Sequence, residues 1–572
     1  MFETLNTRVA ESAIGRWFRL DGSGHPKQRE GSLFTTELRA GTTTFFAMAY
    51  IIAVNASILA DSGGTCVCES TAADPICLQN EAYALCKEVV RRDLITTSAA
   101  VAALASVLMG FFANLPVALA PGLGLNAYFA YSVVGFNGSG SVTYQEALAA
   151  VFLEGWIFFI LSVFGIRQWL ARIIPRSLTL ATGAGIGLFI ALIGLGSAGL
   201  GVVGGDYTNL VGLGGCTAEC DQGSRTCKLL LVHVLRSPTM WLGIFVGGIF
   251  TTLLLLYRVR GAIIIGILLV SIISWPRTTP VTLFPHTAVG DSNFEFFKKV
   301  VAFHKLEKIG NALDYNYGKG QVWIALITFL YVDLFDTTGT LYSMAKFSGV
   351  MNPRTRDFEG STVAYMVDAF SISMGALMGT SPVTAFIESA TGISDGGKTG
   401  ITAMVTGFCF FIAVFFAPIF ASIPSYATGG ALVLVGSLMI KNVVDINWHY
   451  VGDAVPAFLT LILIPFTYNI AYGLITGIIT YVLLNTLPWA IRRLSGRRIS
   501  PPGYEDEREP WSIPEDGLFP RWMRKLASGD RRFWVDDDES YGDDRSVRSR
   551  RTVDEGADST SKTSEEAEKG RV

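Results

Sequence analysis

Residues Phe329–Thr340 read Phe-Leu-Tyr-Val-Asp-Leu-Phe-Asp-Thr-Thr-Gly-Thr, which places Asp333 and Asp336 inside an apolar segment long enough to span a membrane. A second apolar stretch, Gly379–Gly392, reads Gly-Thr-Ser-Pro-Val-Thr-Ala-Phe-Ile-Glu-Ser-Ala-Thr-Gly and contains Glu388. An ionised carboxylate at the middle of a bilayer costs about 2.5–3.5 kcal/mol. Three carboxylates in such segments therefore predict a substrate or proton site.

The composition indicates a polytopic, all-α membrane protein. Half of the 572 residues are apolar and 16% are charged, whereas soluble domains carry about 25% charged residues. Histidine is scarce and no His/Cys cluster has the spacing of metal ligands, so we expect no metal cofactor. Fourteen apolar runs approach or reach spanning length: 41–60, 94–113, 117–135, 147–165, 177–198, 240–257, 261–275, 321–341, 360–378, 381–394, 400–423, 427–441, 454–469 and 471–490.

The polar loop 276–320 divides these runs into seven and seven. We therefore expect an N-terminal segment at 1–40, a first seven-span repeat at 41–275, the loop at 276–320, a second repeat at 321–490 and a tail at 491–572. From position 501 onward the tail holds 19 acidic and 13 basic residues, and it is too polar to bury a core. We expect it to be disordered and cytoplasmic.

Lysine and arginine in short loops predict the orientation, because such loops are retained in the cytoplasm. With an even number of spans, both termini lie on the side that carries Arg167, Arg172, Arg176, Arg258, Arg260, Lys346, Arg354, Arg356, Arg492, Arg493, Arg497 and Arg498. The predicted location is the plasma membrane with both termini in the cytoplasm.

This orientation places seven of the eight cysteines in outer loops, where disulfides form. Their pairing cannot be derived from the sequence, and the use of the glycosylation sequon at Asn137 also stays open. The cysteines are Cys66, Cys68, Cys77 and Cys86 in the first outer loop and Cys216, Cys220 and Cys227 in the third.

Proline and glycine interrupt the third span of each half. Leu119–Tyr128 reads Leu-Ala-Pro-Gly-Leu-Gly-Leu-Asn-Ala-Tyr and contains Asn126, and Gly379–Gly392 contains Glu388. Either interruption alone could be a simple kink, since both residue types are common in membrane helices. Paired interruptions at matching positions instead indicate a transporter binding site, because broken helices expose backbone donors and acceptors at membrane depth.

These stretches resemble the azaguanine-type purine permeases of the nucleobase–cation symporter-2 group over roughly residues 30–495, and the cysteine-rich loop and acidic tail resemble those of fungal members. The resemblance implies two intertwined inverted repeats, with spans 1–4 and 8–11 as a core domain and spans 5–7 and 12–14 as a gate domain. It also implies a short β-strand in the third and tenth spans, homodimers, an elevator motion and import of hypoxanthine, adenine and guanine with protons. The Gln-Glu-Pro signature of the xanthine and uric acid branch is missing, so oxidised purines are less expected.

The residues can be given roles toward a purine, whose flat edge presents both donors and acceptors. We expect Glu388 to accept from the purine edge, Asp333 to hold its other side and Asn126 to line the pocket. Further candidates are the backbone near Gly124 and Ile387, the rings of Phe335 and Phe386, and Ser389 beside the carboxylate.

Proton coupling requires a buried carboxylate that can lose and regain its charge. Asp333 is the first candidate and Asp336 the second; three apart on a helix, they can interact. Glu154 and Asp368 are also acidic residues within spans, and we interpret them as helix-bridging residues.

Other classes of protein fit less well. In an anion carrier the substrate would be repelled by Glu388. A channel or receptor needs neither coupled acids nor paired breaks, and no nucleophile–base pair indicates an enzyme. The expected partners are a purine nucleobase, the lipid bilayer and a second copy of the chain, with no nucleic acid and no cofactor besides the coupling proton.

Overall fold

The computed structural model describes residues 2–68, 77, 80–167, 175–196, 199–202, 235, 237–352, 357–358, 360–496 and 526–529. The chain divides into the compact units Met1–Glu515 and Asp516–Val572, and every helix and strand discussed below belongs to the first. Most of the expected tail lies outside the described residues, as do Cys216, Cys220 and Cys227.

Among the described residues of the first half, the regular elements are helices and one short strand. Its elements are α1 (Phe2–Glu11), α2 (Ala13–Phe18), α3 (Phe34–Met48), α4 (Ile51–Ala60), α5 (Glu81–Leu108), the π-helix η1 (Met109–Ala113), β1 (Leu119–Pro121), α6 (Leu123–Ala127), the π-helix η2 (Tyr128–Val133), the 3-10 turn η3 (Phe136–Gly138), α7 (Tyr144–Val163), α9 (Arg176–Leu195), α10 (Pro238–Leu242), the π-helix η5 (Gly243–Phe250), α11 (Thr251–Leu256) and α12 (Ala262–Ser274).

The second half also combines helices with short strands. It contains α13 (Ala288–Phe297), α14 (Gly320–Phe347), the paired strands β2 (Met351–Asn352) and β3 (Asp357–Phe358), α15 (Ser361–Leu377), β4 (Val383–Ala385), α16 (Ser389–Ser394), α17 (Gly400–Val414), α18 (Ala417–Ala421), α19 (Ser425–Met439), the 3-10 helix η6 (Ile440–Asp445), α20 (Val451–Phe466) and α21 (Ile470–Leu494).

Among the described residues, eight helical segments are long and apolar enough to cross a membrane. They are Phe34–Ala60, Glu81–Ala113, Tyr144–Val163, Arg176–Leu195, Pro238–Leu256, Gly320–Phe347, Ser425–Asp445 and Ile470–Leu494. Four further apolar helices, α12, α15, α17 and α20, are shorter. The protein is therefore a mostly helical, multi-pass membrane protein, as its composition indicated.

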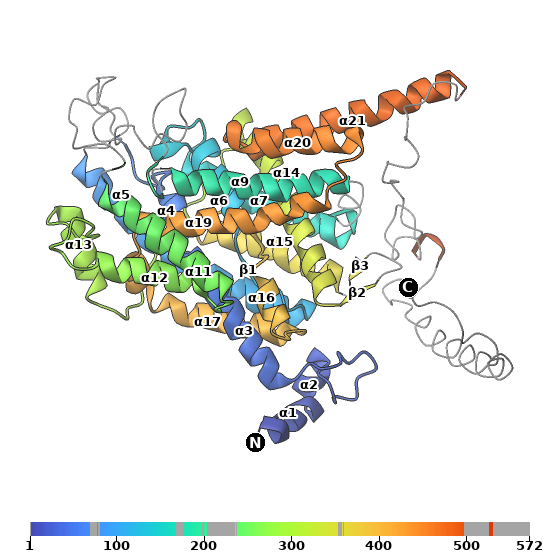
Figure 1. Cartoon of the computed structure of the whole chain (residues 1–572), viewed down its shortest axis with the longest axis horizontal. Helices are drawn as coiled ribbons and strands as arrows, with labels where there is room; N and C mark the ends of the chain where they lie inside the picture. Colours follow the sequence, from blue (N-terminus) through green and yellow to red (C-terminus); the bar gives the residue numbers. More distant parts are fainter. Residues whose placement is uncertain are drawn as a thin grey trace, which may run out of the picture. The chain divides into compact units, whose positions relative to one another are not determined.

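The helices of the first unit pack into two groups. The first group joins α3, α4, α5 and α7 to α14, α15, α16 and α17, with α7 against α15 and α5 against α17. The second group joins α9, η5 and α12 to α19, α20 and α21, and Figure 1 shows α9 running beside α19. Each group thus combines helices from both halves of the chain.

Glycines allow the close approach within the second group. A Cβ on Gly187 of α9 would lie 2.8 Å from the carbonyl oxygen of Gly436 on α19, and one on Gly436 would lie 2.3 Å from that of Gly187. Close packing of α9 against α19 therefore explains these glycines of the predicted span 177–198.

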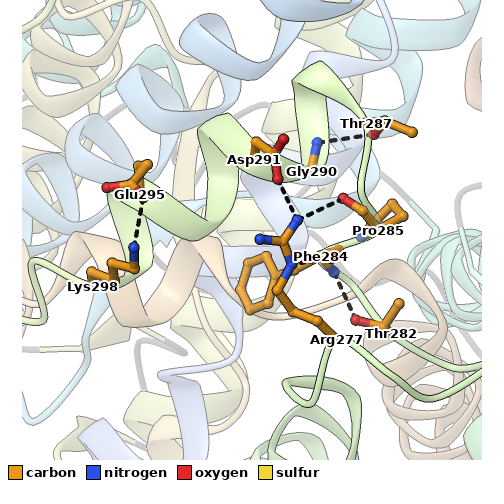
Figure 2. A network of polar contacts seen from close by, with 9 residues as sticks. All are labelled: Arg277, Thr282, Phe284, Pro285, Thr287, Gly290, Asp291, Glu295 and Lys298. Carbon is orange, nitrogen blue, oxygen red and sulfur yellow. Dashed lines mark hydrogen bonds and ion pairs between the residues drawn. The ribbon is translucent and has the colours of Figure 1, made fainter.

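The loop 276–320 is a folded structure that carries α13 (Figure 2). Arg277 lies over the ring of Phe294 (4.9 Å), donates to the carbonyls of Phe284 (2.9 Å) and Pro285 (3.3 Å) and forms an ion pair with Asp291. Figure 2 shows three further contacts in this loop. The hydroxyl of Thr287 accepts a hydrogen bond from Gly290 N (3.1 Å), and the hydroxyl of Thr282 accepts one from Phe284 N (3.1 Å). Glu295 and Lys298 form an ion pair (2.6 Å).

Asp93 of α5 holds the second part of this loop in place. The carboxylate is fully buried and accepts hydrogen bonds from the backbone of Glu307 (2.9 Å) and Lys308 (2.7 Å), and it pairs with His304 (2.8 Å). The buried carboxylate is thus satisfied by the loop that covers it.

Disulfides brace the first predicted outer loop, which confirms that prediction for its four cysteines. Cys66 is bonded to Cys86, and Cys68 to Cys77. Asn137, the sequon residue, is 7% exposed and its side-chain oxygen accepts from Lys87 (2.9 Å). In this folded state its side chain offers little surface to a modifying enzyme.

Candidate functional site

The two interrupted segments meet in an antiparallel ladder near the middle of the first helix group. Strand β1 pairs with β4 in the register Leu119 to Ala385, Ala120 to Thr384 and Pro121 to Val383. Gly122 N donates to Pro382 O (3.0 Å) and Phe386 N donates to Ala118 O (3.1 Å), which extends the ladder at both ends. The backbone groups freed by the two breaks therefore satisfy each other, as membrane depth requires.

Glu388 follows β4 and forms the N-cap position of α16. Its Oε1 accepts a hydrogen bond of 2.5 Å from the hydroxyl of Tyr50, which lies between α3 and α4. Its Oε2 is buried and has no hydrogen-bond partner among the described residues. One oxygen of this carboxylate is thus held in position while the other can accept from a ligand.

Asn126 lies in α6, close to the opposite end of β4. It is fully buried, and its Oδ1 accepts from the hydroxyl of Ser381. Asn55 of α4 donates to the neighbouring Thr380 (3.3 Å) and to Ser98 (2.5 Å). Within the described residues, Asn126 Nδ2 and Asn55 Oδ1 have no partner, so the ladder is bordered by an unused donor and an unused acceptor as well as the Glu388 oxygen.

The other predicted contact residues have structural neighbours. Gly124 packs against α9, since a Cβ there would lie 2.8 Å from Ile186 Cγ2. Phe335 is buried against Tyr331 at a ring distance of 4.9 Å, Phe386 is buried, and Ile387 is half-buried. The Ser389 hydroxyl accepts from Ala118 N (3.0 Å) and so caps the ladder.

Replacement of Ser389 by alanine is expected to destabilise the folded protein by about 1–3 kcal/mol, because the buried Ala118 N–H would lose its acceptor. Ser394→Ala is the matched control on the same helix, since that exposed hydroxyl donates only to Ala390 O, and it should change stability by less than about 0.5 kcal/mol. Thermal melting of both purified variants measures the difference. Equal melting temperatures would contradict the structural role of Ser389.

Asp333 is bound within the protein. Its Oδ2 pairs with Arg167 (3.2 Å), and its Oδ1 accepts from the hydroxyl of Thr337 (2.5 Å). Arg167 also pairs with Asp368 (2.8 Å). Asp336 is half-buried and lies within electrostatic range of Asp333 and Glu388.

Arg167, counted above among the loop cations that predict the orientation, is not an exposed loop cation. The side chain is fully buried just beyond α7, because two acidic residues from α14 and α15 pair with it there. The helix-bridging interpretation agrees with the geometry of Asp368, which is linked to α7 through this guanidinium.

Three site residues were missed by sequence reasoning: Tyr50, Asn55 and Arg167. Tyr50 and Asn55 lie in an apolar run with no proline break to mark them, and their partners on the tenth span lie 338 and 325 positions away. The only signal was their polarity within the first span.

The described residues of the site give no sign of a metal. No three His, Cys, Asp or Glu side chains in the described part of the chain are arranged to hold an ion.

Comparison with known proteins identifies close relatives. Residues 36–476 match the Permease family. The chain is 59% identical to an efflux pump of Aspergillus versicolor over 94% of this chain and 93% of the relative. It is 33% identical to an adenine permease of Escherichia coli (80% and 88% covered) and 33% identical to a guanine/hypoxanthine permease of Bacillus subtilis (80% and 93% covered).

A solved structure shows a similar fold. The murine Solute Carrier 26 member A9, an anion transporter in an inward-facing state, aligns with a TM-score of 0.50 at 12% identity, covering 83% of this chain and 71% of the other. At this identity the likeness concerns the fold alone.

Proposed function

The chain belongs to the Permease family, and from this premise we propose that it carries purine nucleobases across a membrane. Membership also confirms the family resemblance found in the sequence. The names of the Escherichia coli and Bacillus subtilis relatives support adenine, guanine and hypoxanthine as substrates. The relatives are named as permeases and an efflux pump, which supports a transporter and not an enzyme.

The observation that carries the proposal is the paired ladder bordered by unused polar atoms. Glu388 Oε2 and Asn55 Oδ1 can each accept from a purine N–H, and Asn126 Nδ2 can donate to a ring nitrogen or carbonyl. Buried polar groups usually have partners, and a ligand seated at the ladder would supply them for these three atoms. A flat solute with donors and acceptors along its edge matches this set.

The remaining features of the proposal concern the transport cycle. We propose import with protons across the plasma membrane by an elevator motion of the first helix group against the second, in a homodimer. The proposed topology has fourteen passes in two inverted repeats, at 41–275 and 321–490. The loop 276–320 lies outside the cell, and the segments 1–40 and 491–572 lie in the cytoplasm. The eight long helices, the four shorter ones and the two interrupted segments support this topology.

A second candidate function differs in the direction of transport, because the Aspergillus versicolor relative is named an efflux pump. Nothing in the ladder itself favours one direction, since the same groups can take a ligand from either side. Export of the same solutes is therefore the alternative.

Uptake of radiolabelled hypoxanthine into proteoliposomes tests the proposal. We expect competition by adenine and guanine, weak competition by xanthine and uric acid, none by uracil or cytosine, and faster uptake when the outside is acidified. Liposomes preloaded with hypoxanthine measure release under the opposite gradient. Absence of uptake and release would overturn the proposed function, and net export under an inward proton gradient would replace import by the alternative.

A further inference from the structure

A buried charged cluster lies between α7, α14 and α15, and two of these helices, α14 and α15, also contact strand β4 of the ladder. It consists of Arg167, Asp333, Asp368 and Glu154, all fully buried. The guanidinium pairs with Asp333 (3.2 Å) and Asp368 (2.8 Å). It is also stacked between two rings, with Phe158 at 4.2 Å and Tyr365 at 5.0 Å.

The three acids differ in the number of donors that reach them. Both oxygens of Asp333 accept hydrogen bonds, from Thr337 and Arg167, and one oxygen of Asp368 does so. Neither oxygen of Glu154 has a partner among the described residues, although the side chain is fully buried. Three carboxylates facing one cation would leave two uncompensated negative charges in the membrane interior, which is strongly unfavourable. A proton on the carboxylate that receives no donor removes one of them.

Glu154 faces the cluster. It lies one helical turn before Phe158, so both side chains are on the same face of α7, and Phe158 covers the guanidinium. The charged groups that act on it electrostatically are Asp333, Arg167 and Asp368. Tyr365 of α15 covers the guanidinium from the other side, and Asp336 of α14 lies within electrostatic range of Asp333, Asp368 and Glu388.

We propose that Glu154 is the proton-carrying carboxylate of the transport cycle, an inference that rests on the proposed function. Its O–H bond forms with a proton from the water on one side of the membrane and breaks when that proton passes to water on the other side. No electron transfer and no further reactant are involved. This role replaces both the helix-bridging interpretation of Glu154 and the assignment of the proton to Asp333.

Arg167 connects this proton to the substrate site. When Glu154 loses its proton, its charge attracts the guanidinium and weakens the pairs with Asp333 and Asp368. Asp333 lies on α14 together with Asp336, and Asp336 is electrostatically coupled to Glu388 at the ladder. The protonation state of Glu154 therefore alters the charge balance at the nucleobase site without a contact to the nucleobase.

The test compares Glu154→Gln, which keeps the shape but is always neutral, with the wild type in proteoliposomes. Two readouts are taken: accumulation of hypoxanthine under an imposed inward proton gradient, and exchange of labelled for unlabelled hypoxanthine at equal pH. We expect Glu154→Gln to lose accumulation at least tenfold and to lose the pH dependence of uptake between pH 5 and 7.5, while exchange falls less than about threefold.

Two further variants make the outcome decisive. Glu146→Gln is the matched control on α7, because Glu146 caps that helix and pairs with Lys319 (2.7 Å) away from the cluster, and it should accumulate like the wild type. Asp336→Asn examines the competing proton site. Accumulation by Glu154→Gln at the wild-type level, or its loss in Asp336→Asn alone, would overturn the inference while the proposed function stands. A wild type that shows no hypoxanthine transport would overturn both.

Discussion

Replacement of Arg167 by methionine is expected to destabilise the protein by about 3–5 kcal/mol, because it leaves Asp333 and Asp368 buried without their cation. That loss is comparable to a large part of the stability of a typical domain. We expect little folded protein in the membrane, measured as the monodisperse fraction of a detergent extract and its melting temperature.

A compensating variant separates charge from packing at this position. The triple variant Arg167→Met, Asp333→Asn, Asp368→Asn removes the acids together with the cation, and it should recover most of the melting temperature without transport. Arg167→Lys should fall between the two, because a lysine cannot reach both carboxylates and stack between Phe158 and Tyr365 in the same way. An Arg167→Met protein that melts like the wild type would show that the pairs do not support the fold.

The membrane class and the order of the elements could be predicted because apolar runs and Pro-Gly breaks are local in the sequence. The ends of the helices were less predictable. Helix α3 begins at Phe34 and not at 41, because the buried Glu37 is satisfied by the backbone of Lys398 (2.9 Å) and the hydroxyl of Thr402 (2.6 Å). The predicted span leaves the charged Glu37 outside, because its partners are more than 360 positions away and could not be foreseen.

The residues of the candidate site also fall into those that the sequence revealed and those that it did not. Glu388 and Asn126 were found because each sits beside a visible break, whereas the partner of Glu388, Tyr50, has no such mark. The burial of Arg167 was not foreseen, because its acidic partners lie 166 and 201 positions away in the sequence. What the sequence could not supply is the pairing in space that turns Asp333 from a free carboxylate into a bound one.

The two polar centres are therefore distinct but electrically connected. The ladder offers unused atoms to a ligand, while the cluster around Arg167 holds charge in the protein interior. Helix α14 joins them, since Asp333 belongs to the cluster and Asp336 lies within range of Glu388. Under the proposed mechanism, a change of charge in the cluster alters the electrostatic environment of Glu388 through the acids of α14.

Glu388→Gln is expected to reduce nucleobase transport by about 30- to 150-fold. Hydrogen bonds to charged groups contribute about 1.5–3 kcal/mol, and the variant replaces a charged acceptor with an amide whose nitrogen would face the ligand donors. The upper part of that range, about 2–3 kcal/mol, corresponds to the stated factors. The measurement is the initial rate of hypoxanthine uptake, divided by the amount of folded protein in the membrane.

Tyr50→Phe provides the matched variant for the same carboxylate. It removes the donor to Oε1 but keeps the charge and Oε2, so we expect a loss of less than about tenfold, from poorer positioning of Glu388. Comparison of the two separates the charge of Glu388 from its orientation. Wild-type uptake by a correctly folded Glu388→Gln protein would remove Glu388 from the binding site, and an equal loss in both variants would mean that the Tyr50 hydrogen bond, and not the charge, determines binding.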